Sequence, residues 1–543
     1  MHKIILSLIV LLWYSNLNAD NLIAPGTDND SLKTAPASWW MLDPEHAGVP
    51  GINVDKAYEF LKGRTSNTVV VAVIDSGIDI EHEDLQEVIW TNPNEIEGNG
   101  LDDDKNGYID DIHGWNFLGN QKGEHIEHDS YELTREFVRL QEKYSVMSES
   151  QQKADEEWDY YVKIEKEYHN TVKKMEDQYA GFKGFYDQYK KAERLLEAYM
   201  DVEELTKEDL MSWESPDDKI TLARDIMMTA FDNGFNSEQM DKGVEYFTTA
   251  LNYGYNPEFN PREVIGDNID DLYETAYGNN DVIGKFNMHG THVAGIIGAN
   301  RHNNIGVQGV ADNVRIMVLR AIPNGDERDK DVANAIRYAV DNGAQIINMS
   351  FGKRFSPDKQ VVDEAIQYAE SKGVLLIHAA GNSAHNNDEV VHYPSEKITS
   401  TDSRVNNMLV VGAADWKGGA QLAASFSNFG KTSVDVFAPG VDILSASPNQ
   451  KYEEASGTSM AAPVTTGIAA LVMSYFPGLS AVEVKSILVK SVVSYRNQKV
   501  NIPGKEEETK FGELSVTGGV VNAYEAVKLA QKSRPKGKKL KRE

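Results

Sequence analysis

The fold is decided by residues 69–79, which read VVVAVIDSGID. Six apolar residues follow one another there, most of them β-branched, and the run ends on the carboxylate of Asp75. Such a run is typical of a strand buried on both faces, as strands are in a parallel sheet covered by helices. We therefore expect an α/β fold in three layers, with a mostly parallel central sheet flanked by helices and the chemistry at the carboxyl ends of the strands.

Two other segments carry side chains that can complete a catalytic group with Asp75. Residues 289–295 read HGTHVAG and place His289 at the start of a predicted helix. Residues 457–463 read GTSMAAP and place Ser459 where a predicted strand gives way to an apolar helical run. A serine in the first turn of a helix exposes its hydroxyl near the positive end of the helix dipole, but it needs a base to act as a nucleophile. His289 is the expected base, and Asp75 is the expected partner of its other ring nitrogen.

A fourth segment, residues 375–382, reads LLIHAAGN and describes a strand that runs into Gly-Asn. With these four segments and the chain order Asp, His, Ser, the sequence resembles the subtilisin-like serine proteases, the subtilase family of peptidase S8 type. The resemblance implies a subtilisin-like fold and a triad of Asp75, His289 and Ser459. It also implies that the Asn382 side chain and the Ser459 backbone N–H bind the oxyanion of a tetrahedral intermediate.

Some of these positions also allow plainer interpretations. An Asp-Ser-Gly sequence at Asp75 is common in turns. His292 follows His289 at helical spacing, and a His-x-x-His pair is compatible with zinc. Zinc sites need three or four ligands, however, and no third ligand or intervening glutamate accompanies the pair. We therefore expect His292 to be a histidine packed in the core.

The resemblance also implies where a polypeptide substrate binds. Residues 348–352 read NMSFG, and the equivalent segment of the family pairs with the substrate backbone through Ser350, Phe351 and Gly352. Ala380 and Gly381 then form the facing wall of the P1 pocket, together with the stretch 383–392. Main-chain pairing selects extended chains and not sequences, so the P1 preference stays open.

Two calcium sites are predicted, both structural, and no catalytic cofactor is expected. Residues 102–110 read DDDKNGYID, which supplies Asp102, Asp104, Asn106 and Asp110 at the spacing of a calcium loop. His113 stands where such a loop has its bidentate glutamate, and an acidic turn that is merely solvated is the alternative. The resemblance implies a second site, built by Asp84 and the loop that contains Asn304.

Composition limits the compartment and the partners. Residues 1–19 have a lysine, a short apolar run and a small residue at the end, so we expect a signal peptide and a secreted or periplasmic protein. That run is too short to span a bilayer, and we expect no transmembrane segment. No cysteine is present, and 54 basic against 84 acidic residues give a net charge of −30. Nucleic acids are therefore not expected partners. The resemblance implies polypeptide substrates.

The segment between Asp75 and His289 is too long for one crossover between parallel strands. Most of the excess lies in residues 121–262, which carry 18 basic and 32 acidic residues and an apolar stripe at helical spacing. One interpretation is a helical hairpin that packs on itself, and the other is a lid, a folding aid or a docking arm for an unknown partner. The expected organisation is a signal peptide (1–19), an N-terminal extension (20–50), a catalytic domain in two parts (51–120 and 263–531), the helical insertion (121–262) and a basic tail (532–543).

The function expected from these features is that of a secreted serine endopeptidase that works through an acyl-enzyme. Two alternatives stay open. One is a selective processing protease whose access is restricted by the helical insertion. The other is a catalytically inactive scaffold that uses the helices for binding.

Overall fold

The computed structural model of the chain describes residues 34–211, 213 and 215–533. The predicted signal peptide therefore lies outside the described residues, as do the first part of the N-terminal extension and nearly all of the basic tail. The described residues form two compact units. We call residues 128–260 the helical unit and residues 34–127 with 261–533 the sheet unit. The predicted domain boundaries remain predictions.

The sheet unit contains a nine-stranded sheet with the order β10-β13-β7-β6-β5-β4-β1-β3-β2. All neighbouring strands in it are parallel except β10 and β13. Its strands are β1 (Val69–Asp75), β2 (Gly114–Asn116), β3 (Val314–Arg320), β4 (Ile346–Met349), β5 (Leu375–Ala379), β6 (Met408–Ala414), β7 (Val436–Pro439), β10 (Val493–Ser494) and β13 (Gly519–Val520). Two hairpins lie outside the sheet, β8 (Ile443–Ser447) with β9 (Lys451–Ala455) and β11 (Lys499–Asn501) with β12 (Glu508–Lys510).

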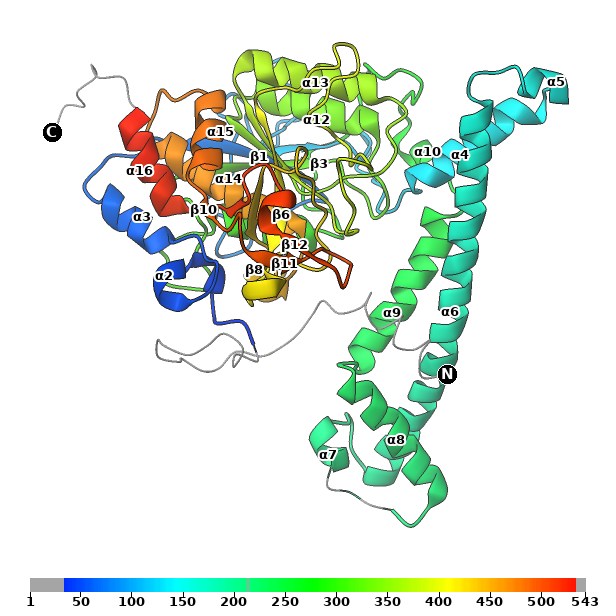
Figure 1. Ribbon diagram of the computed structural model, residues 1–543. Helices are drawn as coiled ribbons and strands as arrows, with labels where there is room; N and C mark the ends of the chain where they lie inside the picture. The colour runs from blue at the N-terminus through cyan, green and yellow to red at the C-terminus, as the bar shows by residue number, and fades with distance from the viewer. Residues whose placement is uncertain (1–33, 212, 214, 534–543) are drawn as a thin grey trace. The chain divides into compact units, whose positions relative to one another are not determined.

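Helices cover both faces of this sheet, because successive residues of a strand point to opposite sides. Val71 and Val73 of β1 face a core shared with α3 (Val54–Leu61), α11 (Met288–Gly298), α14 (Thr458–Tyr475), α15 (Ala481–Lys490) and α16 (Ala523–Ser533). Ala72 and Ile74 face a second core shared with α12 (Asp329–Asp341) and α13 (Lys359–Lys372). The three-layer arrangement predicted from the sequence is confirmed (Figure 1).

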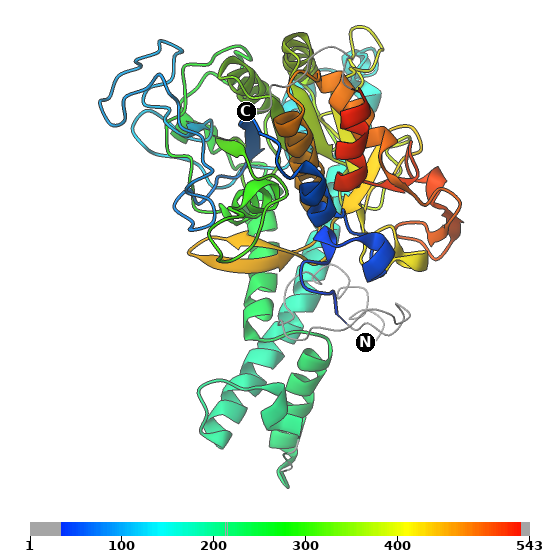
Figure 2. The same ribbon diagram turned by 90° about the vertical axis from the view of Figure 1, so that its left-hand side faces the viewer.

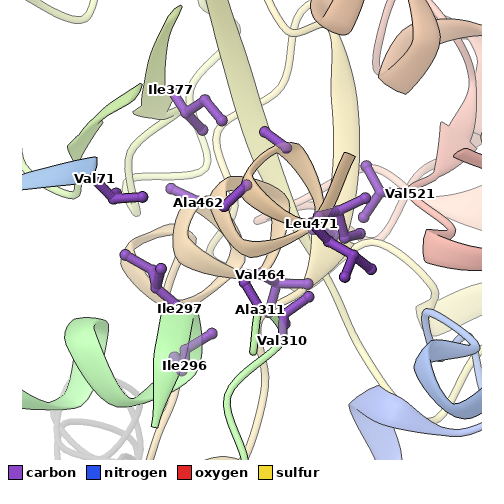
Figure 3. Packing of buried hydrophobic residues seen from close by; sticks show 14 of the residues in the cluster. Val71, Ile296, Ile297, Val310, Ala311, Ile377, Ala462, Val464, Leu471 and Val521 are labelled. Atoms are coloured by element: carbon purple, nitrogen blue, oxygen red, sulfur yellow. The ribbon is translucent and has the colours of Figure 1, made fainter. Parts of the chain in front are cut away.

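The helix that begins at the serine segment runs through the middle of the larger core. In Figure 3, side chains from the sheet, from α11 and from the segment after it surround α14 on several sides. Ala462, Val464 and Leu471 of α14 are fully buried. The start of α14 is therefore held rigidly at the edge of the sheet.

Shorter elements complete the sheet unit. They are η2 (Trp39–Met41), α2 (Pro44–Ala47), α10 (Arg262–Ile265), η4 (Gly419–Gln421) and η5 (Phe511–Glu513). Among the described residues, no helix of either unit combines the length and the apolar character needed to cross a membrane.

The helical unit packs on itself around α6 (Trp158–Met200), which runs alongside α8 (Asp218–Asp232) and α9 (Ser237–Thr249) (Figure 1 and Figure 2). Met175, Phe182 and Leu196 of α6 lie in a core cluster that is separate from those of the sheet unit. The remaining elements are α4 (Glu132–Ser145), α5 (Glu149–Gln152), α7 (Lys207–Met211) and the π-helix η3 (Ala250–Gly254). The apolar stripe seen in the sequence is thus the inner face of this unit.

Candidate active site

Asp75 and His289 come together at the carboxyl edge of the sheet. Asp75 ends β1, His289 lies in the first turn of α11, and the His289 Nδ1 to Asp75 Oδ1 distance is 2.7 Å. The close approach depends on Gly290, because a Cβ there would lie 2.2 Å from the carbonyl oxygen of Gly77. The Ser76 backbone N–H donates to the same carboxylate oxygen at 2.8 Å and fixes its orientation. Burial lowers the pKa of His289, and the Asp75 carboxylate more than offsets this, so that the pKa lies above its ordinary value.

Ser459 is the second residue of α14 and opens onto the same edge. Its hydroxyl donates to the carbonyl oxygen of Ser350 at 2.9 Å, and the Ser350 hydroxyl donates to the Ser459 carbonyl at 2.9 Å. Asn348 in turn donates to the Ser350 hydroxyl at 2.9 Å. The predicted nucleophile is therefore hydrogen-bonded to the segment predicted to bind substrate, and its hydroxyl donates to Ser350 and not to His289 in this structure.

Asn382 follows β5 and is oriented by Thr458. Its Oδ1 accepts from the Thr458 backbone N–H and from the Thr458 hydroxyl, both at 2.9 Å. Only the oxygen of the amide can accept from an N–H, so this contact assigns the amide orientation and leaves the Nδ2 hydrogens free to donate elsewhere. The backbone N–H of Ser459 lies in the first turn of α14, where no carbonyl oxygen of the same helix can accept from it. Asn382 Nδ2 and this N–H are therefore two hydrogen-bond donors beside the Ser459 hydroxyl.

These residues line one pocket, which has a volume of about 430 Å³. Of the predicted substrate-binding residues, Ser350, Phe351 and Gly352 line it on one side and Gly381 on the other. Ala380 does not line it, because its side chain packs in a core cluster with Val410 and Phe437. The full lining is Asp75, Ser76, Phe286, His289, Ile322, Pro323, Asn324, Gly325, Asp326, Glu327, Ser350, Phe351, Gly352, Ala379, Gly381, Asn382, Ser383, His392, Thr458 and Ser459.

Residues 322–327 form a pocket wall that the sequence did not indicate. They follow β3, the strand next to β1, and so emerge at the same edge as Asp75. The end of β3 could have indicated this wall, because the loops that follow parallel strands emerge at one edge of the sheet. The segment carries no residue motif of its own, and only the strand order places it here.

The sequence profile of the Subtilase family matches residues 225–515, which is more than half of the chain. The chain belongs to the subtilase family. It is 34% identical over 290 residues to the Thermophilic serine proteinase of Bacillus sp. (strain AK1), which covers 53% of this chain and 60% of that protein. It is 38% identical over 202 residues to the Major intracellular serine protease of Bacillus subtilis (strain 168), covering 36% and 59%. With Subtilisin DY of Bacillus licheniformis it shares 35% identity over 204 residues, covering 37% and 69%.

Each alignment with a relative covers only part of this chain and only part of the relative. The chain spans about 60% of the length of the Bacillus sp. AK1 and Bacillus subtilis relatives. The matched family region begins after Asp75, so the position of Asp75 in this subtilase rests on the geometry described above.

Three further histidines of this subtilase lie near the site and are held neutral. His292 is fully buried and its Nε2 lies 3.0 Å from the Glu453 carbonyl oxygen, so it packs in the core as expected from the sequence. Burial lowers its pKa to about 4. His378 is also buried, with a pKa lowered to about 3, and its ring stacks on that of His392 at 5.4 Å. Burial lowers the pKa of His392 to about 4.

The first predicted calcium loop gathers a different set of carboxylates from the one expected. Asp102 accepts from the backbone N–H groups of Asn106 and Gly107, and Asp110 accepts from those of Asn99 and Gly100. These two carboxylates stabilise the loop itself. Among the described residues, the group whose ligand atoms all lie within 4.8 Å of one another is Glu95, Asp104 and Asp111.

The properties of this acidic group favour a bound hard cation over a loop without an ion. Glu95 Oε2 is buried and has no hydrogen-bond partner among the described residues. Burial raises the pKa of Asp111 to about 6, which reflects the cost of leaving its charge uncompensated. Asn106 is near the group, since it donates to Asp104 and Asp111. Oxygen ligands from carboxylates and amides are those that Ca²⁺ prefers.

At the second predicted calcium site, protein groups already bind the carboxylate of Asp84. Asp84 Oδ1 accepts from Asn303 Nδ2 at 2.6 Å, and its Oδ2 accepts from the Val307 backbone N–H at 2.8 Å. Asn304 adopts a left-handed backbone conformation in the same loop, with φ of 58°. Both oxygens of Asp84 therefore already have protein donors, and a calcium site at Asp84 and Asn304 stays a prediction.

Proposed function

We propose that this subtilase is a serine endopeptidase that hydrolyses peptide bonds in polypeptide substrates. The observation that carries the proposal is the 2.7 Å hydrogen bond between His289 Nδ1 and Asp75 Oδ1 in a pocket that also exposes Ser459. An acid, an imidazole and a hydroxyl at one open edge are the parts that acyl transfer to serine requires.

The steps follow from the roles of these groups. His289 Nε2 accepts the Ser459 proton while Ser459 Oγ attacks the substrate carbonyl carbon, and Asp75 stabilises the imidazolium that forms. Asn382 Nδ2 and the Ser459 N–H donate to the oxyanion. The tetrahedral intermediate collapses, the amide bond breaks, and His289 gives the proton to the leaving amine. Water, deprotonated by His289, then hydrolyses the acyl-enzyme and regenerates Ser459.

Covalent labelling tests this proposal directly. A fluorophosphonate probe should label the wild-type protein at Ser459, and Ser459→Ala should abolish both labelling and peptide hydrolysis. A folded wild-type protein that reacts with neither probe nor peptide would support the inactive scaffold instead.

We also propose that Ca²⁺ stabilises the protein structurally at Glu95, Asp104 and Asp111. An ion bound only in the folded state raises stability by mass action. Chelation should therefore lower the midpoint of thermal unfolding and added Ca²⁺ should restore it. Asp104→Asn should remove this response, whereas the exposed neighbour Glu97→Gln should keep it. A midpoint that chelation leaves unmoved would contradict the proposal.

Export is proposed from the sequence of residues 1–19. The name of the Bacillus subtilis relative describes an intracellular protein, so membership of the family does not fix the compartment. Sequencing the N-terminus of protein recovered from culture medium and from cell fractions tests the proposal. Recovery of the uncleaved chain from the cytosol alone would contradict it.

A further inference from the structure

A buried arginine, Arg320, lies outside the triad but contacts the segments that carry it. It ends β3, in register with Asp75 of β1. Its side chain is only 2% exposed. Nε donates to the carbonyl oxygen of Ser76 at 3.1 Å, and the N–H of that same residue orients the Asp75 carboxylate. Burying a guanidinium cation costs free energy unless ion pairs and hydrogen bonds compensate its charge. The groups that bind Arg320 therefore indicate which segments it connects.

The partner of Arg320 is Glu127. Nη2 of Arg320 donates to Glu127 Oε2 and to the carbonyl oxygen of Ile126, both at 3.1 Å. The other carboxylate oxygen, Oε1, accepts from the Lys285 backbone N–H at 3.3 Å. The Glu127 carbonyl accepts from the backbone N–H of Asn324, which lines the pocket, at 2.8 Å. One glutamate therefore contacts the arginine, the pocket wall and the segment that leads to α11.

The guanidinium also lies against the segment that precedes His289. Gly284 has a φ of 64°, and a Cβ there would come within 2.3 Å of Arg320 Nε. Two residues later, the carbonyl oxygen of Phe286 accepts from the Ser76 hydroxyl at 2.8 Å. Arg320 is thus packed between the segment after Asp75 and the segment before His289.

We propose that the Arg320–Glu127 ion pair positions the Asp75–His289 couple. The proposal deepens the proposed endopeptidase function and rests on it. Neither side chain contacts a reacting atom, so both act as positioning residues. They act through Ser76 on one side and through residues 284–286 on the other.

The charges around the pair give the proposal a signature that packing alone does not produce. Asp75 on β1, Asp281 and His125 in the neighbouring loops and Lys285 are ionisable residues near the pair, and His125 lies 3.0 Å from Glu127 and 3.5 Å from Asp281. His289 itself also faces the buried His292, and Asp326 and Glu327 line the same pocket. Removing the Glu127 charge leaves the arginine cation uncompensated, which disfavours the His289 imidazolium. Removing the Arg320 charge leaves an extra carboxylate, which favours the imidazolium.

The test is the pH profile of peptide hydrolysis for Glu127→Gln, Arg320→Gln and the double variant. Because His289 acts as a neutral base, the acid limb of kcat/KM should move to lower pH in Glu127→Gln and to higher pH in Arg320→Gln. Each shift should be about half a pH unit, the size expected for one charge that acts across a partly solvated site without direct contact. The double variant should return the limb towards its wild-type position. In both single variants kcat should fall by about tenfold to a hundredfold with KM little changed, because a small misplacement of catalytic groups lowers the rate of the chemical step.

Glu274→Gln is the matched control, since Glu274 is a partly exposed glutamate paired with a fully buried cation, Lys330, away from the pocket. It should leave kcat and the acid limb unchanged. If Glu127→Gln behaves like Glu274→Gln, the pair is only structural and the proposal is overturned. If Arg320→Gln does not fold, the comparison of Glu127→Gln with Glu274→Gln still decides. A wild-type protein that hydrolyses no peptide would instead refute the proposed function.

Discussion

The two units of this chain use charged side chains in different ways. In the sheet unit, charged groups are buried at strand ends, such as Asp75 and Arg320, and in the first turn of a helix, such as Asp331 of α12. Along the long helix of the helical unit they lie on the surface in pairs four residues apart, such as Lys173 with Asp177. The helical unit buries charge mainly near its start, where Glu132 and Glu136 of α4 are almost inaccessible.

This contrast indicates which unit tolerates unfavourable charge burial for the sake of function. An exposed pair at i,i+4 contributes about 0.3–0.5 kcal/mol, mainly to helix formation. A buried charge costs several kcal/mol unless it is compensated, and such groups are retained where their positions matter. We therefore expect the sheet unit to carry the chemistry, and four experiments test this division.

The largest effect is expected from Ser459→Ala. It should lower kcat by about 10⁶-fold, a loss measured on a subtilisin, because no other group supplies the nucleophile. The thermal midpoint should stay close to that of the wild type, since only a hydroxyl is lost. Ser383→Ala, at another serine that lines the pocket, is the control and should keep most activity. Equal rates for Ser459→Ala and wild type would refute the assignment.

The next effect concerns the oxyanion donor. Asn382→Asp keeps an acceptor for Thr458 but removes the donor and adds a negative charge, so kcat should fall by at least the 10²–10³-fold found on a subtilisin for loss of such a donor. KM should change little, because the donor acts on the transition state. Steady-state kinetics with a chromogenic peptide measure both quantities. A change confined to KM would place the donor elsewhere.

An intermediate effect is expected on stability in acid. His292 and His378 have folded pKa values lowered to about 4 and about 3, mainly by burial, against an ordinary value near 6.5. As the pH falls below 6.5 the unfolded state takes up protons that the folded state does not, so each histidine removes up to about 1.4 kcal/mol per pH unit. His289 does not oppose this loss below pH 6.5, because its raised pKa adds stability that is fully present there and is lost only as the pH rises from 6.5 through the folded value.

Three histidines with lowered pKa values, His292, His378 and His392, therefore destabilise the folded state as the pH falls from 6.5 to about 4, and all three lie in the sheet unit. Hydrogen exchange with mass spectrometry, recorded from pH 7 to pH 5 and corrected for the intrinsic exchange rate, should show protection falling in β5 and α11. His378→Asn should reduce the pH dependence. Protection in β5 that stays constant over this range would contradict the expectation.

The smallest effect on small substrates is expected when residues 128–260 are replaced by a short Gly/Ser linker. The two core clusters around the sheet draw no residue from this range, and each doubling of loop length costs only about 0.6 kcal/mol. Hydrolysis of a small peptide should persist while the rate on folded proteins changes. A variant that folds cooperatively but loses small-peptide activity would show that the helical unit shapes the site. A peptide-to-protein rate ratio equal to that of the wild type would exclude a lid and favour a docking arm.

The sequence by itself determined the parts of this protein that local chemistry specifies. The apolar run before Asp75 predicted a buried parallel strand, because only strands covered on both faces lack polar alternation. The apolar stripe of residues 133–179 predicted the inner face of the helical unit, because spacing alone defines a helix face. The motifs around His289, Ser459 and Asn382 predicted which side chains share a pocket, since each lies at the end of a strand or the start of a helix.

Only the tertiary structure decided which carboxylates meet and which charges are buried. Asp102 and Asp110 have the spacing of calcium ligands, yet backbone N–H groups within eleven residues of them bind their oxygens, and Glu95 and Asp111 gather around Asp104 instead. Arg320 and Glu127 are 193 residues apart and carry no motif. Their contact depends on strand order and on the path of the loops between strands, which are properties of the whole packed chain and not of any local segment.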